Sequence, residues 1–180
     1  MSDWIQTFTG KKFYPLNPLP EDVDIHDIAH ALSLTCRFGG HCREPYNVAQ
    51  HSLLVTKRLA SQKADLKIML WGLLHDASEA YLCDLPSPVK KDDRMASYRE
   101  HEKAVMAAIC HKFGLPFEEP EEVRAADKYA FSLEAWSLFP REMVREWKHV
   151  LPDTGEHITP IDAQTAEHKF LAVFEKLSAA

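Results

Sequence analysis

Residues 71–81 of the chain run Trp-Gly-Leu-Leu-His-Asp-Ala-Ser-Glu-Ala-Tyr, and this stretch decides how the rest of the sequence is interpreted. The residues from 68 to 74 are almost all apolar, which predicts a buried helix. His75 and Asp76 follow this apolar run directly. Burying an imidazole and a carboxylate costs free energy unless each is paired. A divalent cation would compensate both costs, so the pair indicates a metal site if further ligands converge on it.

Length and composition predict one soluble globular domain. The chain has 180 residues, of which 46% are hydrophobic and 27% are charged, as is usual for globular proteins. This length is enough for one core and short for two. The formal net charge of −6 argues against a general affinity for nucleic-acid polymers, which require basic surfaces. A small phosphorylated ligand needs only a local cluster of Arg or Lys, so it remains compatible with this charge.

We expect neither a secretory leader nor a membrane span. The first ten residues include Asp3 and lack a basic segment followed by an apolar run, and no apolar run approaches about 18 residues. The cysteines at 36, 42, 83 and 110 form neither a C-x-x-C pair nor a disulfide framework. Cys36 and Cys42 flank His41, but no second Cys/His cluster completes a zinc site. Free thiols in a cytoplasmic protein are the expected interpretation.

The apolar periodicity predicts an all-α, single-domain bundle over about residues 24–178. Residues 1–20 contain two apolar clusters and three prolines, which predict a small N-terminal β-hairpin or an extended segment. N-cap residues, glycines and prolines predict where each helix begins and ends. The expected helices run from Asp24 to about Gly39-Gly40, from Asn47 through Leu59, from Asp65 to about Tyr81, from Asp92 to Phe113, from Glu121 to Phe139, from Arg141 to Trp147, and from Thr159-Pro160 through Phe174.

Two further residues on other expected helices complete a candidate metal site with His75 and Asp76. His51 lies upstream of the pair and Asp127 lies downstream. Taken alone, His51 would usually be a hydrogen-bonded core histidine and Asp127 a surface charge. Together the four side chains supply two imidazoles and two carboxylates, which suit Mn²⁺, Co²⁺, Fe²⁺, Ni²⁺ or Zn²⁺ rather than Ca²⁺ or Mg²⁺. A coordination position left to water would make the site catalytic.

The order H…HD…D, with intervals of 24 residues (51 to 75) and 51 residues (76 to 127), resembles the HD-domain metal-dependent phosphohydrolase superfamily. The segments NVAQHS (47–52), HDASE (75–79) and DLPSPVK (84–90) are similar to its bacterial 5′-deoxynucleotidase branch. The resemblance extends from about Arg37 to about Asp127. It implies an HD-type helical bundle in which one divalent transition metal, held by His51, His75, Asp76 and Asp127, activates water against a nucleotide phosphate.

The resemblance assigns catalytic roles to Glu79 and Asp84. On a continuous helix, Glu79 would share a face with His75 and Asp76. Its carboxylate would orient or deprotonate the attacking water, or protonate the leaving oxygen. The alternative is an ordinary surface glutamate. Asp84 would bind the sugar hydroxyl or assist proton transfer, or would instead cap the turn before Pro86.

Arg37, Phe38, His41 and Lys90 are the expected substrate contacts. The Arg37-Phe38 pair resembles the Arg-aromatic pair of the deoxynucleotidases, in which the guanidinium clamps phosphate and a Trp packs against the sugar. Phe38 stands where that family has Trp, so the preference between ribose and deoxyribose stays open. His41 and Lys90 would add contacts to the phosphate or the base, or are ordinary loop and surface residues.

The leading expectation is a phosphomonoesterase that acts on (deoxy)nucleoside 5′-monophosphates. Alternatives are a dNTP triphosphohydrolase, an HD-like oxygenase with two irons, and an inactive module that binds metal and nucleotide for regulation. One metal ion is expected rather than two, although His101 and His111 lie where dinuclear family members place extra histidines. Homodimers are common in the family, and three aromatic residues would either bury a partner or complete the core: Trp136, Phe139 and Trp147.

Overall fold

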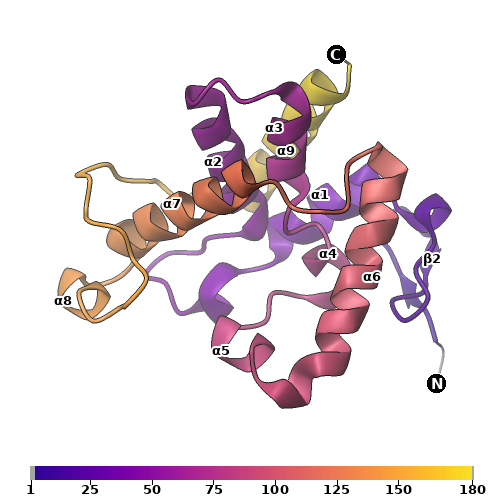
Figure 1. Ribbon diagram of the computed structural model, residues 1–180, viewed down its shortest axis with the longest axis horizontal. Coiled ribbons are helices and arrows are strands. Elements are labelled where there is room, and N and C mark those ends of the chain that lie inside the picture. Colours follow the sequence, from indigo (N-terminus) through magenta and orange to yellow (C-terminus); the bar gives the residue numbers. More distant parts are fainter. Residues whose placement is uncertain (1–2, 180) are drawn as a thin grey trace.

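The computed structural model describes residues 3–179, and helices make up most of it (Figure 1). The expectation of a mostly helical bundle with a small N-terminal hairpin is confirmed. Strands β1 (Ile5–Gln6) and β2 (Lys12–Phe13) pair antiparallel. The helices are α1 (Ile25–Leu34), α2 (Val48–Ser61), α3 (Leu66–Leu74), α4 (Glu79–Leu82), α5 (Ser87–Lys90), α6 (Ala96–Phe113), α7 (Glu121–Leu138), α8 (Arg141–Val144) and α9 (Ala163–Ser178).

Side-chain caps explain where several of these helices begin and end. The Asp24 carboxylate accepts a hydrogen bond from the His26 amide at the start of α1. The Asn47 side chain accepts one from the Gln50 amide at the start of α2. Gly114 ends α6 with a φ of 65°, a left-handed conformation that favours glycine. These caps act within a few residues, which is why the sequence alone locates them.

The prediction that the first helix continues to Gly39-Gly40 is wrong, because a β-bridge ends it earlier. Cys36 pairs with Asn47, and the neighbouring backbone bonds run from the Arg37 amide to Tyr46 and from the Val48 amide to Thr35. Helix α1 therefore ends at Leu34. The bridge brings the segment around Arg37 beside the start of α2.

The prediction of one helix from Asp65 to Tyr81 is also wrong, since α3 ends at Leu74 and α4 begins at Glu79. The ring Nδ1 of His75 lies 2.9 Å from the carbonyl oxygen of Gly72. That oxygen is the acceptor that the Asp76 amide would use in a continuing α-helix. Residues 75–78 instead form turns, which place His75 and Asp76 at a helix end.

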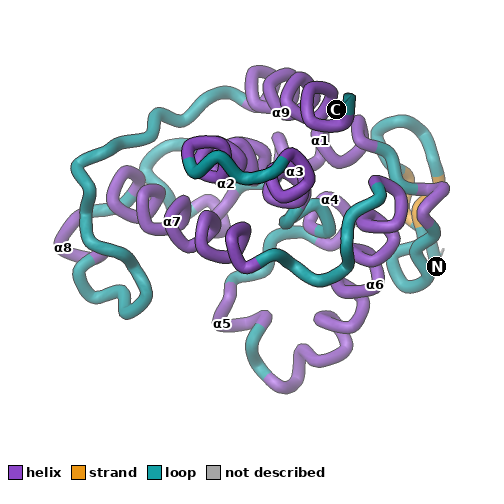
Figure 2. Tube along the Cα trace, turned by 45° about the horizontal axis from the view of Figure 1, so that its top comes forward, coloured by secondary structure: helices purple, strands orange, loops and turns teal. Residues whose placement is uncertain are grey.

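The last helix begins at Ala163 rather than at Thr159-Pro160. The side chain of Gln50 binds the extended segment before it, through a bond to the Thr159 carbonyl and another from the Ile161 amide. Helix formation then starts at Asp162, whose carboxylate accepts from the Thr165 amide. Helix α8 is also shorter than expected, and a long loop runs from it to α9 (Figure 2).

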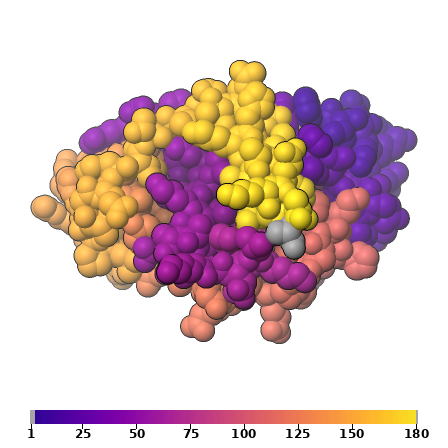
Figure 3. Space-filling view, turned by 90° about the horizontal axis from the view of Figure 1, so that it is seen from above, coloured from indigo at the N-terminus to yellow at the C-terminus, as the bar shows by residue number. Residues whose placement is uncertain are grey.

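The core lies where α2 and α3 pack against each other and against α7 and α9, with α1 behind them. Figure 3 shows the C-terminal residues, in yellow, lying across the segment that contains α2 and α3. The core side chains are mainly aliphatic, and these are fully buried: Ile28, Leu32, Leu59, Leu73, Leu74 and Ile109. This packing fixes the relative positions of the helices that carry the candidate metal ligands.

The aromatic residues of the C-terminal half pack within the chain. The Trp136 indole donates a hydrogen bond to the Leu151 carbonyl at 2.9 Å. The rings of Phe139 and Trp147 lie 5.1 Å apart, and each also contacts Phe38. These contacts form a half-buried aromatic cluster within this chain. Among the described residues, no helix is both long and apolar enough to cross a membrane.

A substitution at Gly72 tests how closely α2 and α3 pack. A Cβ atom at this position would lie 2.3 Å from Cδ1 of the buried Leu59. We expect Gly72→Ala to lower the free energy of unfolding by about 1–3 kcal/mol through overpacking, measured by urea denaturation. Helix propensity alone would raise it by about 1 kcal/mol, so unchanged or increased stability would contradict the close packing described.

Candidate metal centre

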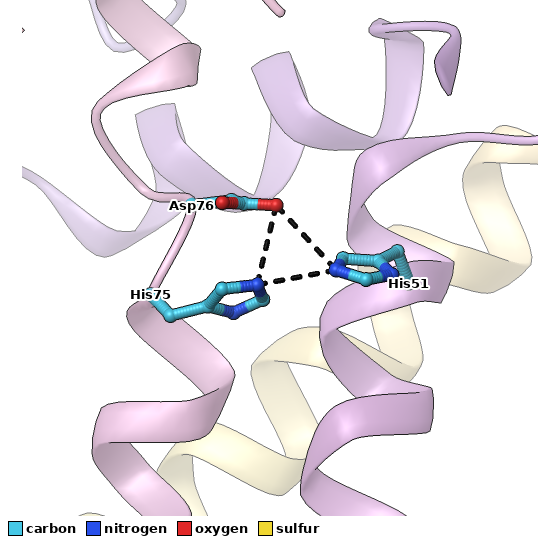
Figure 4. Close-up of side chains that lie close together, drawn as sticks. All are labelled: His51, His75 and Asp76. Atoms are coloured by element: carbon cyan, nitrogen blue, oxygen red, sulfur yellow. Dashed lines mark hydrogen bonds and ion pairs between the residues drawn. The ribbon is translucent and has the colours of Figure 1, made fainter. Parts of the chain in front are cut away.

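The candidate ligands come from three elements that meet in the interior. His51 lies in the first turn of α2, His75 and Asp76 follow the last residue of α3, and Asp127 lies on α7. Figure 4 shows the side chains of His51, His75 and Asp76 directed toward one another. Both imidazoles are almost fully buried, whereas the side chain of Asp127 is 40% exposed. The site is therefore anchored in the core and open on the side of Asp127.

One nitrogen of each imidazole faces the same point. The Nε2 atoms of His51 and His75 are 3.1 Å apart. Oδ2 of Asp76 lies 3.5 Å from the first and 3.3 Å from the second, and these three side chains can offer ligand atoms that all lie within 4.8 Å of one another. Oδ1 of Asp127 lies 3.1 Å from Nε2 of His51 and 3.9 Å from Nε2 of His75. The structure thus brings all four predicted ligands together.

The other ring nitrogens show which atoms are free to bind a metal. Nδ1 of His75 lies 2.9 Å from the Gly72 carbonyl oxygen, and Nδ1 of His51 lies 2.6 Å from a carboxylate oxygen of Glu134. Both partners are acceptors, so each Nδ1 carries the proton. In the neutral imidazoles the two Nε2 lone pairs then point at each other and at carboxylate oxygens. Such a set of acceptors requires a proton or a cation at its centre.

The spacing of these atoms fits a metal ion with nitrogen and oxygen ligands. Metal–nitrogen bonds of about 2.0–2.1 Å, at ligand angles between about 90° and 109°, place neighbouring ligand atoms about 2.8–3.4 Å apart. The separations among Nε2 of His51, Nε2 of His75 and Oδ2 of Asp76 are 3.1–3.5 Å. The His-His-Asp group therefore has the geometry and the donor chemistry of a metal-binding site.

Without a metal, protons occupy the place of the cation. Burial by itself would lower the pKa of His75, but the charge of Asp76 and its hydrogen bond raise that pKa to about 10. Burial would likewise raise the pKa of Asp76, yet His75, His51 and Arg37 hold it well below its usual range. Asp76 therefore stays ionised, and a cation entering the site would displace a proton from the imidazoles.

Glu134, which the sequence analysis missed, lies directly behind His51. Its side chain is fully buried in α7 and accepts hydrogen bonds from His51 and from the hydroxyl of Tyr46, at 2.6 and 2.9 Å. Burial would raise its pKa, but the charges of Arg37 and His51 outweigh burial and lower it. Glu134 is seven residues after Asp127, which places both on one helix face. That spacing is the only signal the sequence offers.

Glu79 is buried three residues after the candidate ligand Asp76, at the start of a separate helix. It begins α4, is 5% exposed, and its Oε2 has no hydrogen-bond partner among the described residues. Burial, followed by the charges of Asp76 and Asp84, raises the pKa of Glu79 to about 9. Asp84 lies half-buried in the loop after α4, and burial raises its pKa as well. Glu79 therefore does not share the expected helix face with His75 and Asp76, because turns at residues 75–78 separate them.

Of the four expected substrate contacts, Arg37 and Lys90 form ion pairs with residues of the centre, whereas Phe38 and His41 do not. Arg37 reaches the centre, since its Nη1 lies 3.3 Å from Oδ2 of Asp76. Nζ of Lys90 lies 3.9 Å from Oε1 of Glu79 and 2.5 Å from Oε1 of Glu102. Phe38 adopts a φ of 55° and packs in an aromatic cluster beside Arg37. His41 is exposed and forms no hydrogen bond or ion pair with the metal-centre residues that the structure describes.

No protein-family model matches the chain. The chain is 38% identical to the uncharacterized protein YfdR of Escherichia coli K12 over 135 residues, which cover 75% of this chain and 72% of YfdR. It is 35% identical to the uncharacterized protein RCAP_rcc00048 of Rhodobacter capsulatus over 136 residues, which cover 73% of this chain and 69% of that protein. Neither name states an activity.

Metal titration tests the site directly. We expect isothermal titration calorimetry to show about one Co²⁺ ion per chain, and we expect His75→Ala to abolish binding because a nitrogen ligand is lost. Asp127→Asn should weaken binding at least about tenfold, since an amide oxygen is a poorer ligand than a carboxylate. His30→Ala is the matched control, because Nδ1 of His30 also faces a carboxylate, that of Glu167. Equal affinity for Co²⁺ in all four proteins would exclude this site.

Proposed function

We propose that this chain, which belongs to the same family as YfdR and RCAP_rcc00048, is a metal-dependent phosphohydrolase of the HD type. Its substrates would be (deoxy)nucleoside 5′-monophosphates. The observation that carries the proposal is the position of Glu79, a buried carboxylate with an unpartnered oxygen, beside a group of metal-ligand geometry. A structural metal site has no use for such a group, whereas hydrolysis needs a residue that transfers protons.

One divalent transition metal, held by His51, His75, Asp76 and Asp127, would polarise a phosphoryl oxygen and lower the pKa of a water molecule. The chain's own residues support the remaining steps. Arg37 is buried and permanently charged beside Asp76, so it can bind phosphate oxygens and stabilise charge that develops on them.

Glu79 fits the role of general acid. Burial is the largest cause of its raised pKa, and a cation at the site would cancel part of the Asp76 charge but not the burial. Glu79 would therefore keep a raised pKa, and its protonated form can donate to the 5′-oxygen that leaves the phosphorus. Lys90 approaches Oε1 of the same carboxylate at 3.9 Å. Asp84 lies in the following loop and would contact the sugar.

The balance of charge favours a monophosphate over a triphosphate. Arg37 and Lys90 are the basic side chains that form ion pairs with the centre among the described residues, and both already face carboxylates. A triphosphate would bring about four negative charges to a site rich in acidic groups. A single phosphate brings about two, which Arg37 and a divalent cation can neutralise.

A panel of nucleotides assayed with Mn²⁺ or Co²⁺ tests the proposed activity. We expect inorganic phosphate and nucleoside from 5′-monophosphates, identified by chromatography. Triphosphate released from dNTPs would favour the triphosphohydrolase instead. Absence of any hydrolysis by protein shown to hold its metal would leave a regulatory binding module as the better account.

Glu79→Gln separates catalysis from metal binding. The amide has nearly the same size but carries no transferable proton, so kcat should fall at least about 100-fold, while Co²⁺ affinity stays near that of the unaltered protein. Steady-state phosphate release and calorimetry measure the two effects. Glu102→Gln is the control, because Glu102 binds Lys90 from α6 and is not placed among the catalytic groups. Full activity in Glu79→Gln would exclude the proton-transfer role.

A further inference from the structure

We infer that Glu134 is a positioning residue whose two carboxylate oxygens separately orient a metal ligand, His51, and the phosphate-binding group, Arg37. The inference for His51 depends only on metal binding, and the inference for Arg37 rests on the proposed function. Among the described residues, the Glu134 side chain forms hydrogen bonds or ion pairs with Tyr46, His51 and Arg37. It acts through the two side chains that do the binding.

Oxygen Oε1 of Glu134 fixes the ring of His51. It lies 2.6 Å from Nδ1 of His51 and 2.9 Å from the hydroxyl of Tyr46. Because a carboxylate only accepts hydrogen bonds, Nδ1 must hold the proton and Nε2 must present its lone pair. Nε2 is the atom that lies 3.1 Å from Nε2 of His75 and 3.1 Å from Oδ1 of Asp127. A carboxylate behind the imidazole also increases its basicity as a ligand.

Oxygen Oε2 of the same carboxylate is ion-paired with Arg37, without the alignment of a hydrogen bond. Nε of Arg37 lies 3.2 Å from Oε2, as an ion pair, and Nη1 of Arg37 reaches Oδ2 of Asp76 at 3.3 Å. The guanidinium is therefore held between the buried glutamate and a metal ligand. Because Nε and Nη1 face these carboxylates, Nη2 is the guanidinium nitrogen left for phosphate oxygens.

Stability alone does not explain this arrangement. Glu134 is completely buried and the side chain of Arg37 is 12% exposed. Taking such charges out of water costs several kcal/mol per ion, and apolar residues of similar volume are often as stable. Three side chains from one stretch of the sequence nevertheless converge on this distant carboxylate: Arg37, Tyr46 and His51. Orientation of the two binding groups accounts for this convergence.

The Glu134→Gln variant tests whether Glu134 orients His51 and whether it orients Arg37. An amide offers one oxygen, which should remain with the two donors His51 and Tyr46, so its NH₂ group would face Nε of Arg37. We expect Co²⁺ affinity to fall about 10–100-fold, because a neutral amide supports the imidazole less well than a carboxylate. The visible spectrum of bound Co²⁺ should change. Binding of inorganic phosphate to the Co²⁺-loaded protein should weaken at least about tenfold, with a matching rise in KM.

Glu167→Gln provides the matched control. Glu167 also faces a histidine Nδ1, that of His30, at 3.1 Å, so the same chemical change is made away from the metal centre. Its Co²⁺ affinity, spectrum and phosphate binding should equal those of the unaltered protein. Glu134→Gln with native circular dichroism, and with Co²⁺ affinity and phosphate binding within twofold of the control, would overturn the inference. Weakened Co²⁺ binding with unchanged phosphate binding would overturn its Arg37 half.

Tyr46→Phe carries the test if Glu134→Gln does not fold. It removes one donor to Oε1 and keeps the carboxylate, so a smaller loss of Co²⁺ affinity, about two- to fivefold, supports the inference. Affinity equal to that of the control overturns it. These readouts do not depend on turnover. If the unaltered protein binds Co²⁺ but releases no phosphate, the proposed function fails. The Co²⁺ affinities of the variants still test whether Glu134 orients His51.

Discussion

Two imidazole nitrogens, each with its lone pair directed inward, meet carboxylate oxygens in the interior of this protein, and the rest of the structure depends on what holds them together. Nε2 of His51 and Nε2 of His75 are 3.1 Å apart, closer than two such acceptors remain without a proton or cation between them. The contact of α2 with α3 at Gly72, the turn after Leu74 and the position of α7 all bring ligands to this point. The helices thus pack around a group of hydrogen-bond acceptors whose lone pairs need a proton or a cation between them.

The break between α3 and α4 separates the metal ligands from the group that would transfer protons. On one continuous helix, Glu79 would lie four residues after His75 and three after Asp76, and so beside both. With turns at residues 75–78, Glu79 instead begins its own short helix and stays buried with one oxygen unpartnered. Behind His51, the carboxylate of Glu134 joins this ligand to Arg37. In the proposed function, metal binding, phosphate binding and proton transfer would thus belong to distinct but connected side chains.

Apolar periodicity and caps in the sequence predicted the helical fold, and the H…HD…D pattern predicted four side chains that the structure brings together. Contacts between separate segments determined the limits of α1 and α9, which the sequence did not predict. Caps such as Asn47 act on adjacent amides and are visible in the sequence. The early end of α1 depends on the bridge from Cys36 to Asn47, eleven residues later, and the late start of α9 depends on Gln50. Glu134 was missed because nothing near it in the sequence shows that three distant side chains surround it.

Anomalous diffraction from crystals grown with Mn²⁺ or Co²⁺ tests the central claim most directly. The account predicts one strong anomalous peak per chain, bounded by Nε2 of His51, Nε2 of His75 and carboxylate oxygens of Asp76 and Asp127, with Glu134 still bound to Nδ1 of His51. A fully occupied ion elsewhere, or two imidazoles joined by a proton in protein saturated with metal, would contradict it.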